Sequence, residues 1–163
     1  MVADGVHILL SLALVMITFR SRRPEPYFVT ALAAAVPDID VIVFHPLIDL
    51  GYVEGALWVH RGLTHSLVGG IVIVGLLSAF GPWRAAAIGF GSHIVLDFMT
   101  GGVRLLAPFD AALYGVSYDW MLMNLLTSTF AVTVLLSGML VAKYEFRAQI
   151  PSNPPEPVLE WLQ

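Results

Sequence analysis

Cysteine is absent from the 163 residues, and charged side chains are scarce. Without cysteine the chain can form neither a disulfide nor a thiolate metal site, and it has no cysteine nucleophile. Asp, Glu, Lys and Arg make up 12% of the sequence, against roughly 25% in soluble domains. The eight basic residues form no large cluster, which argues against nucleic acid as a partner. Any metal site must therefore be built from histidine and carboxylate.

Apolar residues dominate what remains. They make up 58% of the chain, and the mean hydropathy is +0.81, so the composition indicates an integral membrane protein. A bilayer-spanning helix needs ~20 apolar residues, with a range of about 17–25. We expect an all-α bundle of about five transmembrane helices, at residues 2–19, 27–44, 64–80, 83–100 and 121–143. The first of these lacks a positive region before it and a cleavage site after it, so we interpret it as a retained helix.

The basic residues predict an orientation in the membrane. They follow the first, third and fifth expected spans, and the cytoplasmic side of a membrane carries the excess of Lys and Arg. The C-terminus should therefore face the cytoplasm, and the two long loops, 45–63 and 101–120, should face outward across the cytoplasmic membrane. We expect residues 1–147 to form the membrane-embedded domain and the Pro-rich residues 148–163 to form a flexible tail.

The first candidate motif is His60-Arg61-Gly62-Leu63-Thr64-His65-Ser66, directly before an apolar run. Neutral imidazole is a common ligand of zinc and similar ions. His60 and His65 are separated by about 140° around an ideal helix, so one straight helix would not direct both at one ion. A loop that leads into a helix could do so, with Thr64 as the N-cap and His65 in the first turn.

A second motif, Pro37-Asp38-Ile39-Asp40, ends another apolar run. Pro37 should kink or end the helix there. In an extended backbone Asp38 and Asp40 would point the same way, whereas in a helix they would point apart and only one would be a ligand. A carboxylate near the bilayer core costs at least ~2.5 kcal/mol, which favours a divalent ion as its partner. The alternative is a pair of capping or loop carboxylates in water.

A third pair, His93 and Asp97, has the i, i+4 spacing that shares one helix face. Both could bind one ion, or Asp97 could orient His93, or the pair could simply join two membrane helices by a hydrogen bond. His7 in the first expected span is either a ligand or an interfacial residue. In the expected topology the intramembrane ionisable residues share one depth near the outer face: His7, Asp38, Asp40, His65, His93 and Asp97.

Arginine supplies the candidate anion-binding group. The Arg61 guanidinium presents a fork of donors suited to phosphate or carboxylate. It could equally neutralise Asp38 or Asp40, and one side chain could do both. Arg104, which follows Gly101-Gly102, is a second candidate.

Together these motifs resemble the LexA-regulated, YdjM-like family of membrane-bound metal-dependent hydrolases. The resemblance covers residues 7 to 109, and it rests on His7, the three motifs above, and Thr100-Gly101-Gly102 leading to Pro108-Phe109. Family members often carry a histidine after the second aspartate, where this chain has Val41. That removes one possible ligand, unless His45 substitutes. The order of ligands is also similar, more loosely, to zinc-dependent phospholipase C, which implies a phosphoester substrate.

The resulting hypothesis is a metal-dependent hydrolase acting on a phosphoester of a lipid or lipid-linked substrate. The six residues at the shared depth would be the ligands, with His60 binding the ion or supporting a ligand. That is more than one zinc needs, so one or two ions are expected, with zinc favoured and manganese or magnesium possible. Asp40 or Asp97 would accept a proton from metal-activated water, and Arg61 would stabilise the developing charge. The alternatives are a transporter or a proton or metal relay, and a non-catalytic protein braced by metal.

Overall fold

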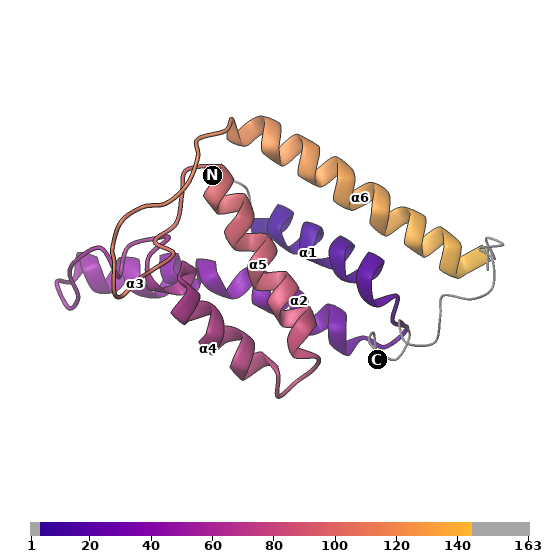
Figure 1. Ribbon diagram of the computed structural model, residues 1–163, viewed down its shortest axis with the longest axis horizontal. Coiled ribbons are helices and arrows are strands. Elements are labelled where there is room, and N and C mark those ends of the chain that lie inside the picture. Colours follow the sequence, from indigo (N-terminus) through magenta and orange to yellow (C-terminus); the bar gives the residue numbers. More distant parts are fainter. Residues whose placement is uncertain (1–3, 145–163) are drawn as a thin grey trace.

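The long apolar segments of the sequence form helices in the computed structural model, which describes residues 4–144 (Figure 1). No β-strand occurs in that part of the chain, so the all-α prediction is confirmed. The elements in chain order are α1 Asp4–Phe19, α2 Glu25–Ala35, the 3-10 turn η1 Val36–Asp38, α3 Ile39–Asp49, the 3-10 turn η2 Leu63–His65, α4 Leu67–Leu77, α5 Trp83–Met99 and α6 Trp120–Tyr144. The predicted Pro-rich tail lies outside the described residues.

Two stretches are long and apolar enough to cross a membrane. They are the nearly continuous α2–η1–α3 segment, Glu25–Asp49, and helix α6, Trp120–Tyr144, each with 25 residues. Every predicted span contains a helix, but α1 has 16 residues, α4 has 11 and α5 has 17, below the ~20 of a perpendicular span. Helix length therefore supports two of the five predicted spans.

Pro37 interrupts the second apolar segment as the sequence predicted. Its ring cannot donate a backbone hydrogen bond, and the chain passes through the single 3-10 turn of η1 before α3 begins. The backbone stays in the helical region at Asp38, with φ −75° and ψ −2°. The helical alternative is thus the correct one, but both carboxylates face His65: Asp38 lies near its Nε2 atom and Asp40 near its Nδ1 atom.

The start of α4 differs from the prediction, which made Thr64 the N-cap. Ser66 is the cap: its backbone is extended, and its hydroxyl accepts a hydrogen bond from the Gly69 N–H at 3.0 Å. Thr64 does not cap this helix; its hydroxyl donates to Asp40 at 2.8 Å. His65 consequently lies in η2, just before the helix rather than in its first turn.

Close packing of α2 against α5 forms the centre of the bundle. The Thr30 hydroxyl donates to the Ala85 carbonyl oxygen at 2.6 Å. At Gly89 a Cβ atom would lie 2.3 Å from the Thr30 carbonyl oxygen, so only glycine permits this approach. Val15, Val29, Ala33, Ala86 and Phe90 fill the core around this contact.

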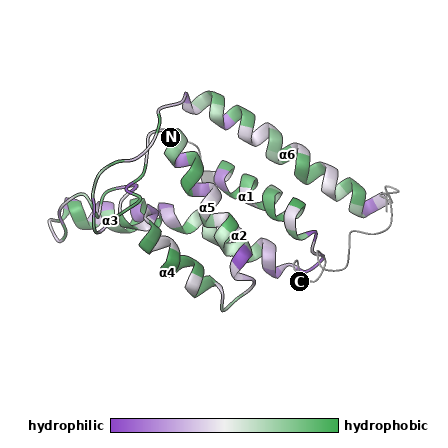
Figure 2. Ribbon diagram, in the orientation of Figure 1, coloured by the Kyte–Doolittle hydropathy of each residue, from purple (hydrophilic) through white to green (hydrophobic). Residues whose placement is uncertain are grey.

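The remaining helices leave apolar faces outside this core. Helix α6 packs against α1 and buries only Thr127 and Ala131, and both α4 and α6 are predominantly apolar along their lengths (Figure 2). The two long loops gather at the end of the molecule where α3 lies, opposite the C-terminal end of α6 (Figure 1). The loops therefore share one end of the bundle, as the predicted topology required.

Candidate metal centre

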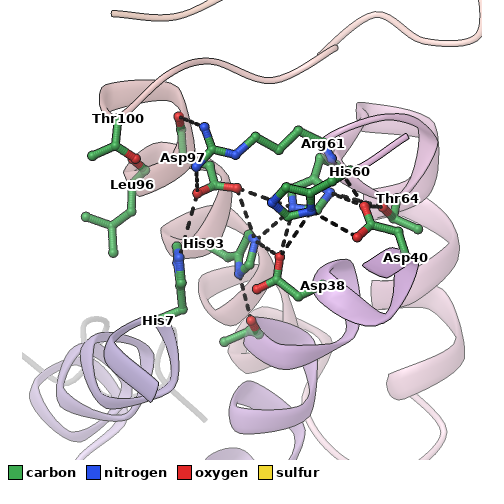
Figure 3. A network of polar contacts seen from close by, with 12 residues as sticks. His7, Asp38, Asp40, His60, Arg61, Thr64, His93, Leu96, Asp97 and Thr100 are labelled. Atoms are coloured by element: carbon green, nitrogen blue, oxygen red, sulfur yellow. Dashed lines mark hydrogen bonds and ion pairs between the residues drawn. The ribbon is translucent and has the colours of Figure 1, made fainter. Parts of the chain in front are cut away.

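Four side chains from three elements direct polar atoms to one place (Figure 3). They are Asp38 from η1, His65 from η2, and His93 and Asp97 from α5, and one ligand atom of each lies within 4.8 Å of the others. The His65 Nε2 atom lies 3.4 Å from Asp38 Oδ1 and 3.3 Å from Asp97 Oδ2. The His93 Nε2 atom lies 3.6 Å from each of the same two oxygens. Four of the six predicted ligands are thus brought together.

The partners of the two imidazoles fix which ring nitrogen carries the proton. His93 Nδ1 lies 2.8 Å from the Ala34 carbonyl oxygen, which can only accept, so Nδ1–H is the donor. His65 Nδ1 lies 3.0 Å from the Thr64 hydroxyl and 3.2 Å from Asp40 Oδ2. In the neutral rings both Nε2 atoms then keep their lone pairs, and these atoms are 3.1 Å apart. Two lone pairs at that distance repel unless a metal ion or a proton lies between them.

The two carboxylate oxygens of Asp97 lie in different environments. Its Oδ1 atom accepts from Arg61 Nη2 at 2.6 Å. Its Oδ2 atom is buried and has no hydrogen-bond partner among the described residues, although it faces both Nε2 atoms. A buried carboxylate oxygen without a donor is costly. This unpartnered oxygen beside two lone pairs is the arrangement that a metal ion would satisfy.

Burial leaves the centre accessible from one side. The side chains of His65, His93 and Asp97 are at most 2% exposed, whereas Asp38 is 13% exposed and His60 is 20% exposed. Water or a substrate group would therefore reach the four ligand atoms past Asp38 and His60.

Asp40 supports the centre from behind His65. Its carboxylate accepts from the Thr64 hydroxyl and from the Arg61 backbone N–H at 3.2 Å, and it lies 3.0 Å from His60 Nδ1. With His60 and His65 it forms a second group that could hold an ion. Because so many donors already occupy its oxygens, Asp40 is better suited to orient His65 than to bind the first ion.

His7 lies beside the four ligand atoms and belongs to neither group. Its ring stacks on that of His93, with centroids 4.0 Å apart, and its Nε2 atom is 3.7 Å from Asp97 Oδ1. Direct metal binding by His7 stays a prediction. His45 is exposed on α3 and is also in neither group. It therefore does not replace the histidine that family members often carry at the position of Val41.

Arg61 differs from the prediction in its partner. The guanidinium binds Asp97 rather than Asp38 or Asp40, and its Nη1 atom also donates to the Gly102 carbonyl oxygen at 3.4 Å. Its backbone has the left-handed φ of 64°, a conformation that non-glycine residues keep where the surroundings require it. A Cβ at Gly101 would lie 2.8 Å from Arg61 Nη1, so the glycine leaves room for the arginine. Arg104 contributes its backbone N–H to the Arg61 carbonyl oxygen at 3.1 Å.

Sequence reasoning missed two supporting groups. The sequence predicts Thr64 as a helix cap, although its place between two candidate ligands is a signal for a supporting role. The Ala34 carbonyl oxygen has no signal in the sequence, because a backbone group acquires a partner on α5 only through tertiary packing.

Two long apolar helices and a buried histidine–aspartate cluster define the class: a helical membrane protein with a candidate metal centre. The sequence matches the family model described as YdjM inner membrane protein over residues 1–154. The chain therefore belongs to the YdjM inner membrane protein family, which confirms the resemblance seen in its motifs. No curated protein and no solved structure matches it.

Proposed function

We propose that this protein binds a divalent metal ion through Asp38, His65, His93 and Asp97, and that it hydrolyses a phosphoester of a membrane lipid or lipid-linked substrate. The observation that carries the metal part is the convergence of two imidazole lone pairs with the unpartnered Asp97 Oδ2 atom in a buried place. Membership of an inner membrane family supports a substrate that resides in the bilayer.

The spacing of the ligand atoms favours zinc. Bonds of 2.0–2.1 Å in a tetrahedron give ligand–ligand distances of about 3.3 Å, and the same bonds in a magnesium octahedron give about 2.9 Å between neighbours. The five separations that involve an imidazole nitrogen run from 3.1 to 3.6 Å. Two nitrogen and two oxygen donors also suit zinc, with manganese or magnesium as alternatives. A second ion at Asp40, His60 and His65 would require the His65 Nδ1 proton to leave.

The proposed reaction would use both the bound ion and side chains of the protein. A bound divalent ion lowers the pKa of a water ligand to about 7 from 15.7 and polarises a phosphoryl oxygen. His60, held by Asp40 at 3.0 Å, would accept the proton on the accessible side. Arg61 would hold Asp97 in place and lend positive charge to the developing phosphorane-like anion.

A second candidate is a protein in which the ion only braces the helices. Structural zinc sites are closed, with four protein ligands, whereas catalytic sites keep one position for water. Here four protein atoms already surround one place, and three of the four side chains are almost fully buried. Catalysis by this centre would require Asp38, the most accessible ligand, to make room for water.

Metal content tests the site that both candidates require. We would purify wild type, His65→Ala and Asp97→Asn in detergent and measure bound metal by elemental mass spectrometry. His45→Ala is the matched control, since His45 is exposed and outside the cluster. We expect about one equivalent of zinc in wild type and in the control, as a single four-ligand site holds, and loss in the other two variants.

The same samples then test the reaction on phospholipids and polyprenyl phosphates. Hydrolysis that disappears with the metal supports the proposed enzyme. Bound metal without hydrolysis, with a lower melting temperature after chelation, supports the brace. Folded wild type that binds no zinc, manganese or magnesium would reject both.

A further inference from the structure

The loop between α5 and α6 has a fixed backbone. Val103 and Tyr114 exchange two N–H···O bonds of 2.9 Å, and the Val116 N–H donates to the Phe98 carbonyl oxygen at 2.8 Å. One face of the loop is anchored in the protein, because Val103 and Ala107 are completely buried. The positions of the side chains on its other face are therefore set by an ordered backbone.

That other face is apolar and exposed. Phe109 is 88% exposed, the largest value among the large hydrophobic residues that the structure describes. Its N–H donates to the Leu106 carbonyl oxygen at 3.0 Å, so the aromatic ring projects from a formed turn. The exposed apolar side chains of this stretch, which we name the apolar loop face, are Leu106, Phe109, Leu113, Val116 and Tyr118. Such patches are rare on water-facing surfaces and mark contact sites.

Two features indicate lipid as the partner. The apolar loop face runs directly into α6, whose exposed apolar surface begins with Trp120 and belongs to a candidate membrane span. Tyr and Trp are enriched where a bilayer meets water. The acidic residue nearest to Phe109 is satisfied within the loop: Asp110 accepts from the Tyr114 hydroxyl and from the Ala112 N–H.

The loop is also bonded to the candidate metal centre. Its Arg104 N–H donates to the Arg61 carbonyl oxygen, and its Leu105 carbonyl oxygen accepts from the Leu67 N–H at 2.9 Å, at the start of α4. Its Gly102 carbonyl oxygen accepts from the Arg61 guanidinium. Because of these hydrogen bonds, an interaction that holds the loop at one depth in the membrane also holds the histidine–aspartate cluster at a fixed depth.

We infer that the apolar loop face inserts into the interfacial layer of the bilayer, as a second lipid contact besides the spanning helices, and holds the histidine–aspartate cluster at headgroup depth. The partner is the lipid itself, with the ring of Phe109 among the first methylenes of the acyl chains. The inference does not depend on the reaction, since an inactive metal site would be held in the same way.

The cysteine-free chain allows a direct test. A nitroxide spin label on Phe109→Cys, in the full-length protein in vesicles of phosphatidylethanolamine and phosphatidylglycerol, reports collisions with oxygen, which concentrates in lipid, and with a water-soluble nickel chelate. Phe130→Cys on the exposed surface of α6 is the lipid control, and Glu54→Cys in the other long loop is the water control. We expect the oxygen-to-nickel ratio at residue 109 to exceed that at residue 54 severalfold and to approach that at residue 130.

Two results would overturn the inference. A ratio at residue 109 equal to that at residue 54 would place the loop in water. Few collisions with both reagents would mean that another protein surface covers it. Leu113→Cys repeats the measurement on the same face if the Phe109 variant fails to fold, and the far-ultraviolet circular dichroism of each labelled variant must equal that of wild type.

Discussion

At the scale of single residues, His65 connects the two parts of the cluster. Its Nε2 atom faces Asp38, His93 and Asp97, while its Nδ1 atom faces Asp40 and Thr64. The ring can serve as a ligand only if Nδ1 keeps the proton, and the groups behind it enforce that tautomer. Thr64 completes this support, because its hydroxyl donates to Asp40 and accepts from His65.

Replacing Thr64 tests this support without touching a ligand. Thr64→Val keeps the side-chain shape and removes the hydroxyl, so zinc affinity should fall about 10-fold or more, as for other groups that support a ligand. Thr64→Ser keeps the hydroxyl and should bind zinc as wild type does. Competition with a chromophoric chelator measures both. Equal affinities for the Val and Ser variants would show that Thr64 does not control the ring.

At the scale of elements, the contact of α2 with α5 positions the centre. Helix α5 carries His93 and Asp97 at its C-terminal end, and α2 supplies the Ala34 carbonyl oxygen that orients His93. Gly89 sets the distance between the two helices, because a larger residue would meet the backbone of Thr30. The packing of two apolar helices thus determines the geometry of a polar site one turn away.

Two alanine substitutions on α5 separate packing from helix propensity. Gly89→Ala should lower the free energy of unfolding by about 1–3 kcal/mol through overpacking and should also weaken zinc binding. Gly91→Ala meets no atom within 4 Å, and since alanine favours a helix over glycine by up to about 1 kcal/mol, it should be neutral or stabilising. Unfolding in mixed micelles of increasing dodecyl sulfate content compares them. Equal stabilities of the Gly89→Ala and Gly91→Ala variants would contradict the close approach of α2 and α5.

At the scale of the whole molecule, both long loops lie at one end (Figure 1), and the cluster is joined to them through Arg61, which binds Asp97 and the Gly102 carbonyl oxygen. Basic residues follow α1 and α6 and begin α5, whereas Arg61 and Arg104 at the cluster end are bonded into the site or its loop. From the positive-inside rule we propose that the cluster lies on the outer side of the cytoplasmic membrane.

Reporter fusions after Gln163 test this orientation. Green fluorescent protein should fluoresce in the fusion, because it matures in the cytoplasm, and alkaline phosphatase should stay inactive there. Fusions of both reporters after residue 54, in the long loop, provide the opposite control. Active phosphatase at the C-terminus would invert the topology and place the centre on the cytoplasmic side.

The sequence by itself determined the helices, the interruption at Pro37 and the residues that could bind metal. These follow from local properties: runs of apolar residues, the missing N–H of proline, and the helical repeat that aligns His93 with Asp97. The family followed as well, since its motifs can be recognised without knowing their contacts.

Only the tertiary structure decided which atoms face one another. Local sequence could not assign Arg61 to Asp97, Thr64 to Asp40 or the Ala34 carbonyl oxygen to His93, because these partners are 24 to 59 positions apart in the chain. The local sequence also could not show that His7 lies beside the four ligand atoms and outside their group. The contact of Ala34 with His93 depends on how closely α2 and α5 pack, and Gly89 permits that approach.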